Sequence, residues 1–63
     1  MWIKLHSAHD GEEVVVQTQN ITCILKNKMK GSEGETVVNF IGDDSSYILV
    51  YESVDEIGAM IKE

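Results

Sequence analysis

Apolar and polar residues alternate along most of this chain with the two-residue period of half-buried β-strands. Ile3 and Leu5 share one side of an extended segment near the start. Trp2, Lys4 and His6 then share the opposite side. Segments rich in β-branched and aromatic residues recur four more times. The pattern predicts five strands, at about residues 2–8, 12–19, 21–29, 35–41 and 46–51.

Turn residues separate these segments and favour antiparallel pairing. Asp10-Gly11 is a strong hairpin signal because strand-like residues lie on both sides of it. Asn20 fits a tight turn between the second and third strands. A glycine-rich loop at residues 30–34 and a turn at residues 42–45 connect the later strands. These short connections predict an antiparallel meander of about five strands.

The hydrophobic repeat lengthens to that of a helix after the last strand. Ser53 and Glu56 have capping-box spacing, in which each side chain bonds the backbone N–H of the other residue. Apolar residues then continue at helical spacing to Ile57 and Ile61. We therefore expect one C-terminal helix at about residues 54–62.

Strands followed by a single helix indicate the α+β class, in one domain over residues 1–63. Several strands carry apolar residues on both faces, whereas a helix of three turns covers only part of one face. The sheet must therefore curl into a half-barrel or be covered by another subunit. A chain of 63 residues buries only about 60% of its unfolded surface, so its core is marginal. We expect a homo-oligomer.

The composition limits which classes of partner and which cellular compartment fit this chain. Eleven acidic residues against five lysines give a net charge of −6, which repels phosphate backbones and anionic membranes. Cys23 is the only cysteine, which excludes a disulfide within the chain and fits a reducing compartment. Residues 1–10 lack the apolar core of a signal peptide, and the apolar runs are too short to cross a bilayer. We expect a cytoplasmic protein without membrane insertion or nucleic-acid binding.

No catalytic, cofactor-binding or metal-binding residues are predicted. His6 and His9 are three residues apart on an extended segment and point to opposite faces, so they are interpreted as surface histidines. Cys23 shares a strand face with Ile21 and Leu25. That position indicates a small buried hydrophobe rather than a nucleophile, because no base is placed near the thiol. We therefore expect that the chain is not an enzyme.

Lys26, Lys28 and Lys30 form a lysine stripe, because alternate residues of a strand share one face. One interpretation is an anion-binding stripe for nucleic acid or an acidic partner. The other is an edge strand that its lysines protect against uncontrolled pairing. The lack of arginine and of interleaved aromatic residues favours the edge-strand interpretation.

Four further residues are candidates for an interface with another protein chain. Trp2, Tyr47 and Tyr51 are aromatic, and aromatic side chains are enriched in the buried centres of interfaces, although each also fits an ordinary core. Gly58 lies inside the predicted helix, where glycine costs up to ~1 kcal/mol relative to alanine. A glycine at this position indicates close approach to the sheet or to a second chain.

Short sequence matches run through most of the chain. They are residues 3–5 (IKL), Gly11, residues 20–21 (NI), residues 36–38 (TVV) and residues 50–57 (VYESVDEI). In these features the chain resembles the small flagellar FlbD-like family, or a relative of it. The resemblance implies a small cytoplasmic bacterial protein linked to flagellar operons and motor function, and it supplies no catalytic residues.

A second resemblance is to the strand-rich core of LytTR-type DNA-binding domains, which also end in a strand followed by a helix start similar to Glu52-Ser53 with Glu56. It implies a nucleic-acid-binding regulator that uses the lysine stripe, although this chain is shorter and acidic. Our leading hypothesis is a non-enzymatic, self-associating interaction or assembly module. The nucleic-acid-binding regulator is the alternative.

Overall fold

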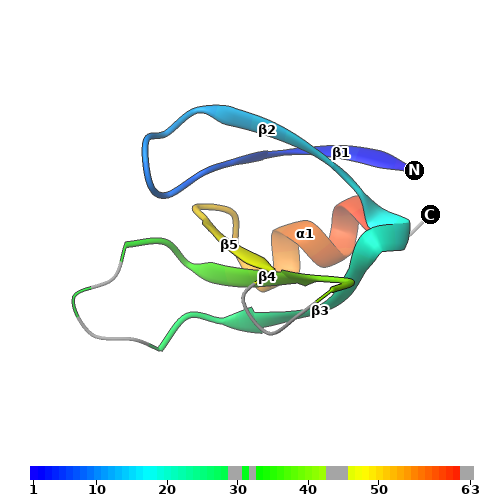
Figure 1. The fold of residues 1–63 in the computed structure, drawn as a ribbon. Coiled ribbons are helices and arrows are strands. Elements are labelled where there is room, and N and C mark those ends of the chain that lie inside the picture. Colours follow the sequence, from blue (N-terminus) through cyan, green and yellow to red (C-terminus); the bar gives the residue numbers. More distant parts are fainter. Residues whose placement is uncertain (29–30, 32, 43–45, 62–63) are drawn as a thin grey trace.

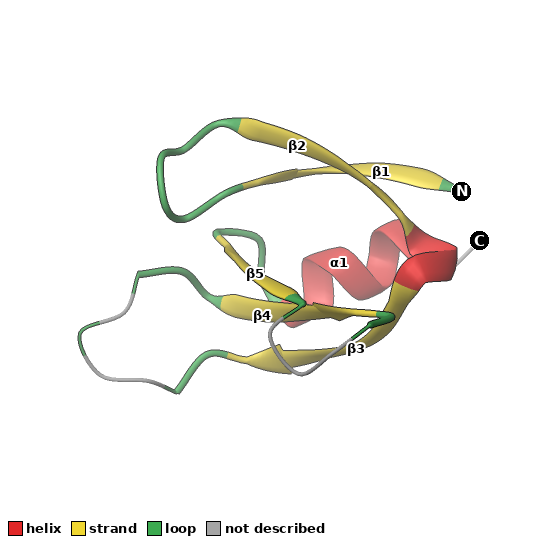
Figure 2. Cartoon of the chain, in the orientation of Figure 1, coloured by secondary structure: helices red, strands yellow, loops and turns green. Residues whose placement is uncertain are grey.

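In the part of the chain that the structure describes, five strands precede one α-helix, which confirms the α+β class (Figures 1 and 2). The structure, a computed structural model, describes residues 1–28, 31, 33–42 and 46–61. In chain order the elements are β1 (Trp2–His6), β2 (Glu13–Gln17), a short 3-10 turn η1 (Thr18–Asn20), β3 (Ile21–Lys26), β4 (Thr36–Phe40), β5 (Tyr47–Val50) and α1 (Val54–Ile61).

The strands form two antiparallel sheets, so the expected single five-stranded meander is wrong. β1 and β2 make a hairpin, and β3, β4 and β5 make a three-stranded sheet in that order. The break falls between β2 and β3, where η1 redirects the chain from one sheet to the other (Figure 1). The backbone carbonyl of Asn20, the last residue of this turn, accepts a hydrogen bond from Ile41 N–H at 2.7 Å, which ties the turn to the end of β4.

The two sheets meet where the chain leaves β1 and β5. Ser7 and Val50 form an isolated antiparallel bridge. Two backbone hydrogen bonds flank it, from Ala8 N–H to Leu49 O at 2.8 Å and from Tyr51 N–H to His6 O at 3.0 Å. The hairpin and the three-stranded sheet are therefore joined by backbone over only a few residues.

The core lies between the two sheets and α1. Ile3 and Leu5 of β1 are buried while Trp2, Lys4 and His6 are exposed, which confirms the predicted alternation. The core cluster draws on every element except β3 and η1. Its buried members are Ile3, Leu5, Val16, Val38, Val50 and Ile57. Since Ile57 of α1 is fully buried among residues of both sheets, the helix holds the hairpin and the sheet together on the side away from the bridge.

A β-bulge in β3 changes which residues face the core. Ile21 pairs with Phe40 and Cys23 with Asn39, so the register shifts between Ile21 and Cys23. Ile21 consequently packs against the core, whereas Cys23 is exposed. The expectation of a buried Cys23 is wrong, because strict alternation from Ile21 ignores the extra residue that a bulge inserts.

Candidate functional site

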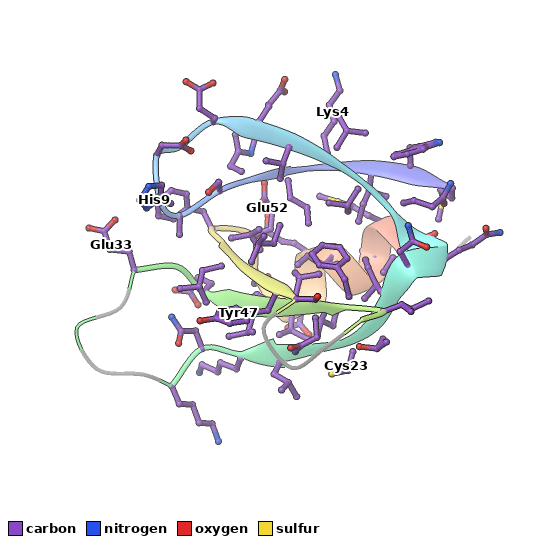
Figure 3. The ribbon with its side chains drawn as sticks, viewed as in Figure 1. Lys4, His9, Cys23, Glu33, Tyr47 and Glu52 are labelled. Atoms are coloured by element: carbon purple, nitrogen blue, oxygen red, sulfur yellow. The ribbon has the colours of Figure 1, made fainter. Side chains whose placement is uncertain are left out.

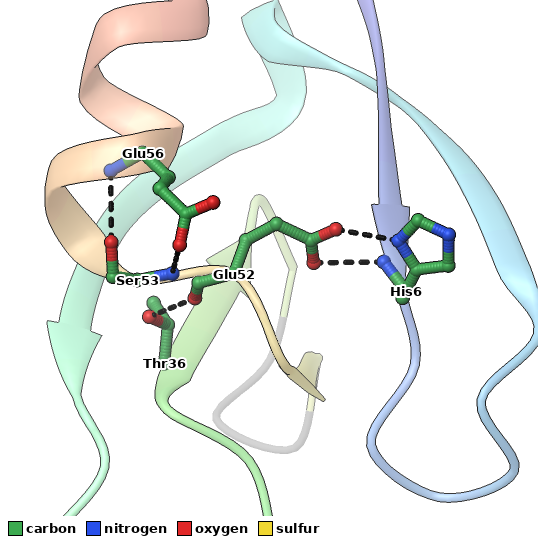
Figure 4. A network of polar contacts seen from close by, with 5 residues as sticks. All are labelled: His6, Thr36, Glu52, Ser53 and Glu56. Atoms are coloured by element: carbon green, nitrogen blue, oxygen red, sulfur yellow. Dashed lines mark hydrogen bonds and ion pairs between the residues drawn. The ribbon is translucent and has the colours of Figure 1, made fainter.

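A polar cluster fastens the end of β5 to β1 (Figure 4). The chain leaves β5 for the helix at Glu52, and its carboxylate accepts two hydrogen bonds from His6. One comes from the backbone N–H at 2.8 Å, and the other joins the ring Nδ1 at 2.7 Å. The Thr36 hydroxyl donates to the backbone carbonyl of Glu52 at 2.6 Å. The Glu52 carboxylate thus accepts the His6 N–H, which a backbone carbonyl would accept if the pairing between β1 and the end of β5 continued.

This pairing shifts the pKa values of both groups. The hydrogen bond to Glu52 raises the pKa of His6 above its ordinary value of 6.5, against a smaller opposing effect of desolvation. Partial burial acts to raise the pKa of the Glu52 carboxyl, but the hydrogen bonds from the His6 ring and backbone outweigh it and lower that pKa. His6 is therefore held protonated, and Glu52 ionised, over a wider pH range than either would be alone.

A capping box holds the cluster in position. Glu56 N–H donates to the Ser53 hydroxyl at 3.0 Å, and Ser53 N–H donates to the Glu56 carboxylate at 3.1 Å. Both predicted bonds are present. Because the cap begins α1 directly after Glu52, it fixes the direction in which the Glu52 side chain leaves the backbone (Figure 4).

An open groove of about 750 Å³ lies along the free edge of β5. Its lining residues come from β5, from the chain after β1 and from the loop before β4. They are Ser7, Ala8, His9, Glu33, Tyr47, Ile48 and Leu49. His9 and Glu33 project from neighbouring loops at one end of the molecule (Figure 3). We call this hollow the β5-edge groove.

Tyr51 and Gly34 contact residues that line the β5-edge groove and hold them in position. The Tyr51 hydroxyl bonds to the Ala8 carbonyl at 3.3 Å and to the Glu33 carboxylate at 3.2 Å, and the bond to Glu33 raises the pKa of Tyr51. Gly34 has φ of +105°, and a Cβ there would lie 2.8 Å from the Cβ of Ala8 and 3.4 Å from that of Leu49. Only glycine lets the loop approach this closely.

The outer face of the three-stranded sheet is uncharged and largely apolar. Strand register places six side chains there: Cys23, Leu25, Val37, Asn39, Tyr47 and Leu49. We call this set the outer face. The core-facing neighbours in the same strands, such as Ile24 and Val38, pack in the core cluster instead. Leu25 is 55% exposed and Tyr47 is 47% exposed, so apolar area on this side of the sheet meets solvent.

The lysine stripe is only partly described. Lys26 ends β3, the outermost strand of its sheet, and Lys28 follows it; both are exposed. Lys30 lies outside the described residues. Lys26 therefore occupies an edge strand, as the protective interpretation requires, and its exposure is equally compatible with binding an anion.

The four candidate interface residues do not form one surface. Trp2 is 65% exposed at the start of β1, whereas Tyr51 lies at the opposite end of the hairpin, beside the β5-edge groove. Tyr47 belongs to the outer face. Gly58 lies on α1, and a Cβ added there would meet no atom within 4 Å, so Gly58 makes no close approach to the sheet. The alternative, close approach to a second chain, stays a prediction.

Among the described residues, no three His, Cys, Asp or Glu side chains gather where they could hold a metal ion. His6 and Glu52 are placed like a base and its orienting carboxylate. Cys23 has the Asn39 amide at 3.5 Å from its Sγ. That amide cannot take a proton from the thiol, so this contact does not activate Cys23 as a nucleophile.

Sequence reasoning missed Glu52, Glu33 and Gly34. Glu52 and His6 are 46 positions apart, and no local pattern pairs them. The one available signal was a carboxylate at the junction of the last strand and the cap.

No helix in the described part of the chain is long and apolar enough to cross a membrane. No family model matches the chain, and neither a curated protein nor a solved structure matches it.

Proposed function

We propose that this protein is a non-enzymatic assembly module that self-associates through the outer face. The observation that carries the proposal is the exposure of this uncharged, largely apolar surface on a sheet whose other side is already covered. Contiguous apolar patches of this kind mark protein interfaces. Burying the patch would also add to the small core of a 63-residue chain.

The composition of the outer face favours a second copy of the chain as the partner. In a two-fold dimer the same patch meets itself, so a charge close to the symmetry axis would lie near the same charge of the second copy. The outer face contains no charged residue, although the chain has a net charge of −6. Association through these six residues brings none of the acidic side chains of the two copies into the centre of the contact.

The solution mass tests this proposal. Light scattering across a dilution series should give a multiple of 7.0 kDa that falls towards the monomer mass for Leu25→Glu. Val15→Glu is the matched control, because Val15 is 53% exposed but lies on the hairpin. Its mass should equal that of the unmodified protein. A monomer at every concentration, or equal loss of mass in both variants, contradicts the proposal.

The rival function is nucleic-acid binding through Lys26 and Lys28, which are both exposed. Retention on heparin and mobility shift with duplex DNA at low salt test it. Unchanged mobility of the DNA at low salt excludes this rival, since phosphate contacts are strongest there.

The resemblance to the FlbD-like family supports a further proposal, that the module acts in the cytoplasm of a flagellated bacterium. Loss of swimming on deletion of its gene would test that.

A further inference from the structure

We propose that the β5-edge groove binds an extended peptide segment carrying a lysine or arginine, which adds to the sheet as a strand beside β5. The inference concerns the backbone edge of β5 and does not rest on the proposed self-association, although Tyr47 and Leu49 belong to both the groove and the outer face. It follows from the direction of backbone groups in β5 and from the charge of the groove.

Successive residues of β5 direct their backbone N–H and C=O groups to opposite edges of the strand. Ser46 O accepts from Phe40 N–H at 2.8 Å, and Ile48 is the register partner of Val38, so these residues bond towards β4. Tyr47 and Leu49 therefore direct their N–H and C=O groups the other way. The Leu49 carbonyl already accepts from Ala8 N–H.

Among the described residues, no strand pairs with Tyr47 on the side away from β4, because the chain turns away after Ala8. Ser7 N–H donates to Glu12 O at 2.9 Å and Gly11 N–H donates to Ser7 O at 2.8 Å, which closes the turn into β2. Within the described residues, three backbone groups are left facing the groove: the N–H and C=O of Tyr47 and the N–H of Leu49. An open row of this kind is the template on which an added strand pairs.

Charge in the groove selects the peptide. Glu33 is the only acidic residue among the described residues that line the groove, and no lysine is among them. The Tyr51 hydroxyl bonds one oxygen of the Glu33 carboxylate. The other oxygen can accept from an ammonium or guanidinium group. The net charge of −6 further repels acidic peptides and attracts basic ones.

The side-chain positions of a bound strand follow from the lining. Tyr47 and Leu49 both line the groove and share one face of β5, so an aromatic ring and an aliphatic side chain stand two positions apart there. Because successive residues of the added strand alternate between faces, apolar residues should recur at every second position. The basic residue should lie at the end of the peptide nearest Glu33.

Selection from phage-displayed random 12-residue peptides provides the probe. We expect enriched sequences with alternating apolar residues and a lysine or arginine. The most enriched peptide is then synthesised and its affinity measured by calorimetry. Tyr47→Pro removes an N–H that points into the groove, at a strand start where proline is tolerated. It should weaken binding about tenfold relative to Tyr47→Ala, which keeps the N–H.

Charge and hydrogen exchange give two further readouts. Glu33→Lys should abolish binding of the basic peptide, whereas Glu35→Lys, on a residue outside the groove, should retain it. In the free protein the amides of Tyr47 and Leu49 should exchange quickly, and the peptide should slow both at concentrations where the protein is monomeric. Equal affinity of Tyr47→Pro and Tyr47→Ala for the peptide, enriched peptides without basic residues, or unchanged exchange at both amides would overturn the inference.

Discussion

The β1–β2 hairpin and the three-stranded sheet are held together differently on two sides of the molecule. On the bridge side, Ser7 pairs with Val50 and the Glu52 carboxylate binds His6, so the contact consists of backbone and polar atoms. On the helix side, Ile57 of α1 fills the space between the sheets. The bridge side therefore depends on backbone geometry, whereas the helix side depends on apolar volume.

The largest expected effect is the loss of that apolar volume. Ile57 has no solvent-exposed surface, so Ile57→Ala should lower the free energy of unfolding by about 2–5 kcal/mol. A domain of this size has roughly 3–5 kcal/mol in total, so Ile57→Val, at about 0.5–1.5 kcal/mol, provides a measurable intermediate. Urea denaturation at one fixed protein concentration tests both variants, because the proposed self-association would make stability depend on concentration.

Met60→Ala is the control for the helix side. Met60 lies on the same helix but is 38% exposed, so its truncation should change the unfolding free energy much less than Ile57→Ala does. Equal losses at the two positions would mean that helix formation itself, rather than the volume of Ile57, sets the stability of this side.

The next largest effect concerns the geometry of the bridge side. Gly34→Ala should destabilise the fold by about 1–3 kcal/mol, because φ is +105° and the new Cβ would lie 2.8 Å from that of Ala8. Gly31→Ala separates the two causes. Gly31 has φ of +79°, but a Cβ there meets no atom within 4 Å. If urea midpoints fall equally in both variants, backbone strain alone explains the effect and the close approach to Ala8 contributes nothing.

The same substitution on the helix side should act in the opposite direction. Gly58→Ala adds a Cβ that meets no atom within 4 Å, and alanine is favoured over glycine in a helix interior by up to ~1 kcal/mol. We expect a higher urea midpoint and more helix by circular dichroism. A lower midpoint together with a lower solution mass would show that Gly58 contacts a second chain.

The features that the sequence predicted correctly depend on residues close together in the chain. Alternation in β1 placed Ile3 and Leu5 in the core, and the spacing of Ser53 and Glu56 defined the cap of α1. The extra residue in β3 is different. Its presence is decided by pairing with β4, so alternation counted along β3 alone placed Cys23 on the wrong face.

The remaining features depend on contacts between distant segments. In the sequence Gly34 looks like any other loop glycine. Glycine is required there because the loop lies so close to Ala8. Glu52 read as an acidic residue before a helix, since its partner His6 lies 46 positions away. The β5-edge groove exists because β1 joins β5 and then turns away. Nothing in the local pattern of residues 46–51 predicts that neighbour.

The smallest expected effect is the pH dependence of the bridge side, and its sign follows from the two pKa shifts. His6 has a raised pKa, so its contribution is full below pH 6.5 and is lost as the pH rises through the folded-state value. Glu52 has a lowered pKa, so its contribution is full above pH 4.5 and is lost as the pH falls through its own folded-state value. The ion pair should therefore stabilise the fold most between pH 4.5 and pH 6.5.

Glu52→Gln isolates this contribution, because the amide oxygen can still accept the His6 backbone N–H while the negative charge is removed. The difference in unfolding free energy between the unmodified protein and Glu52→Gln should be largest between pH 4.5 and pH 6.5 and smaller on both sides of that window. A difference that stays constant with pH would show that the His6 ring adds nothing beyond the backbone hydrogen bond. The bridge side would then be held by backbone geometry alone, and its contrast with the apolar helix side would become sharper.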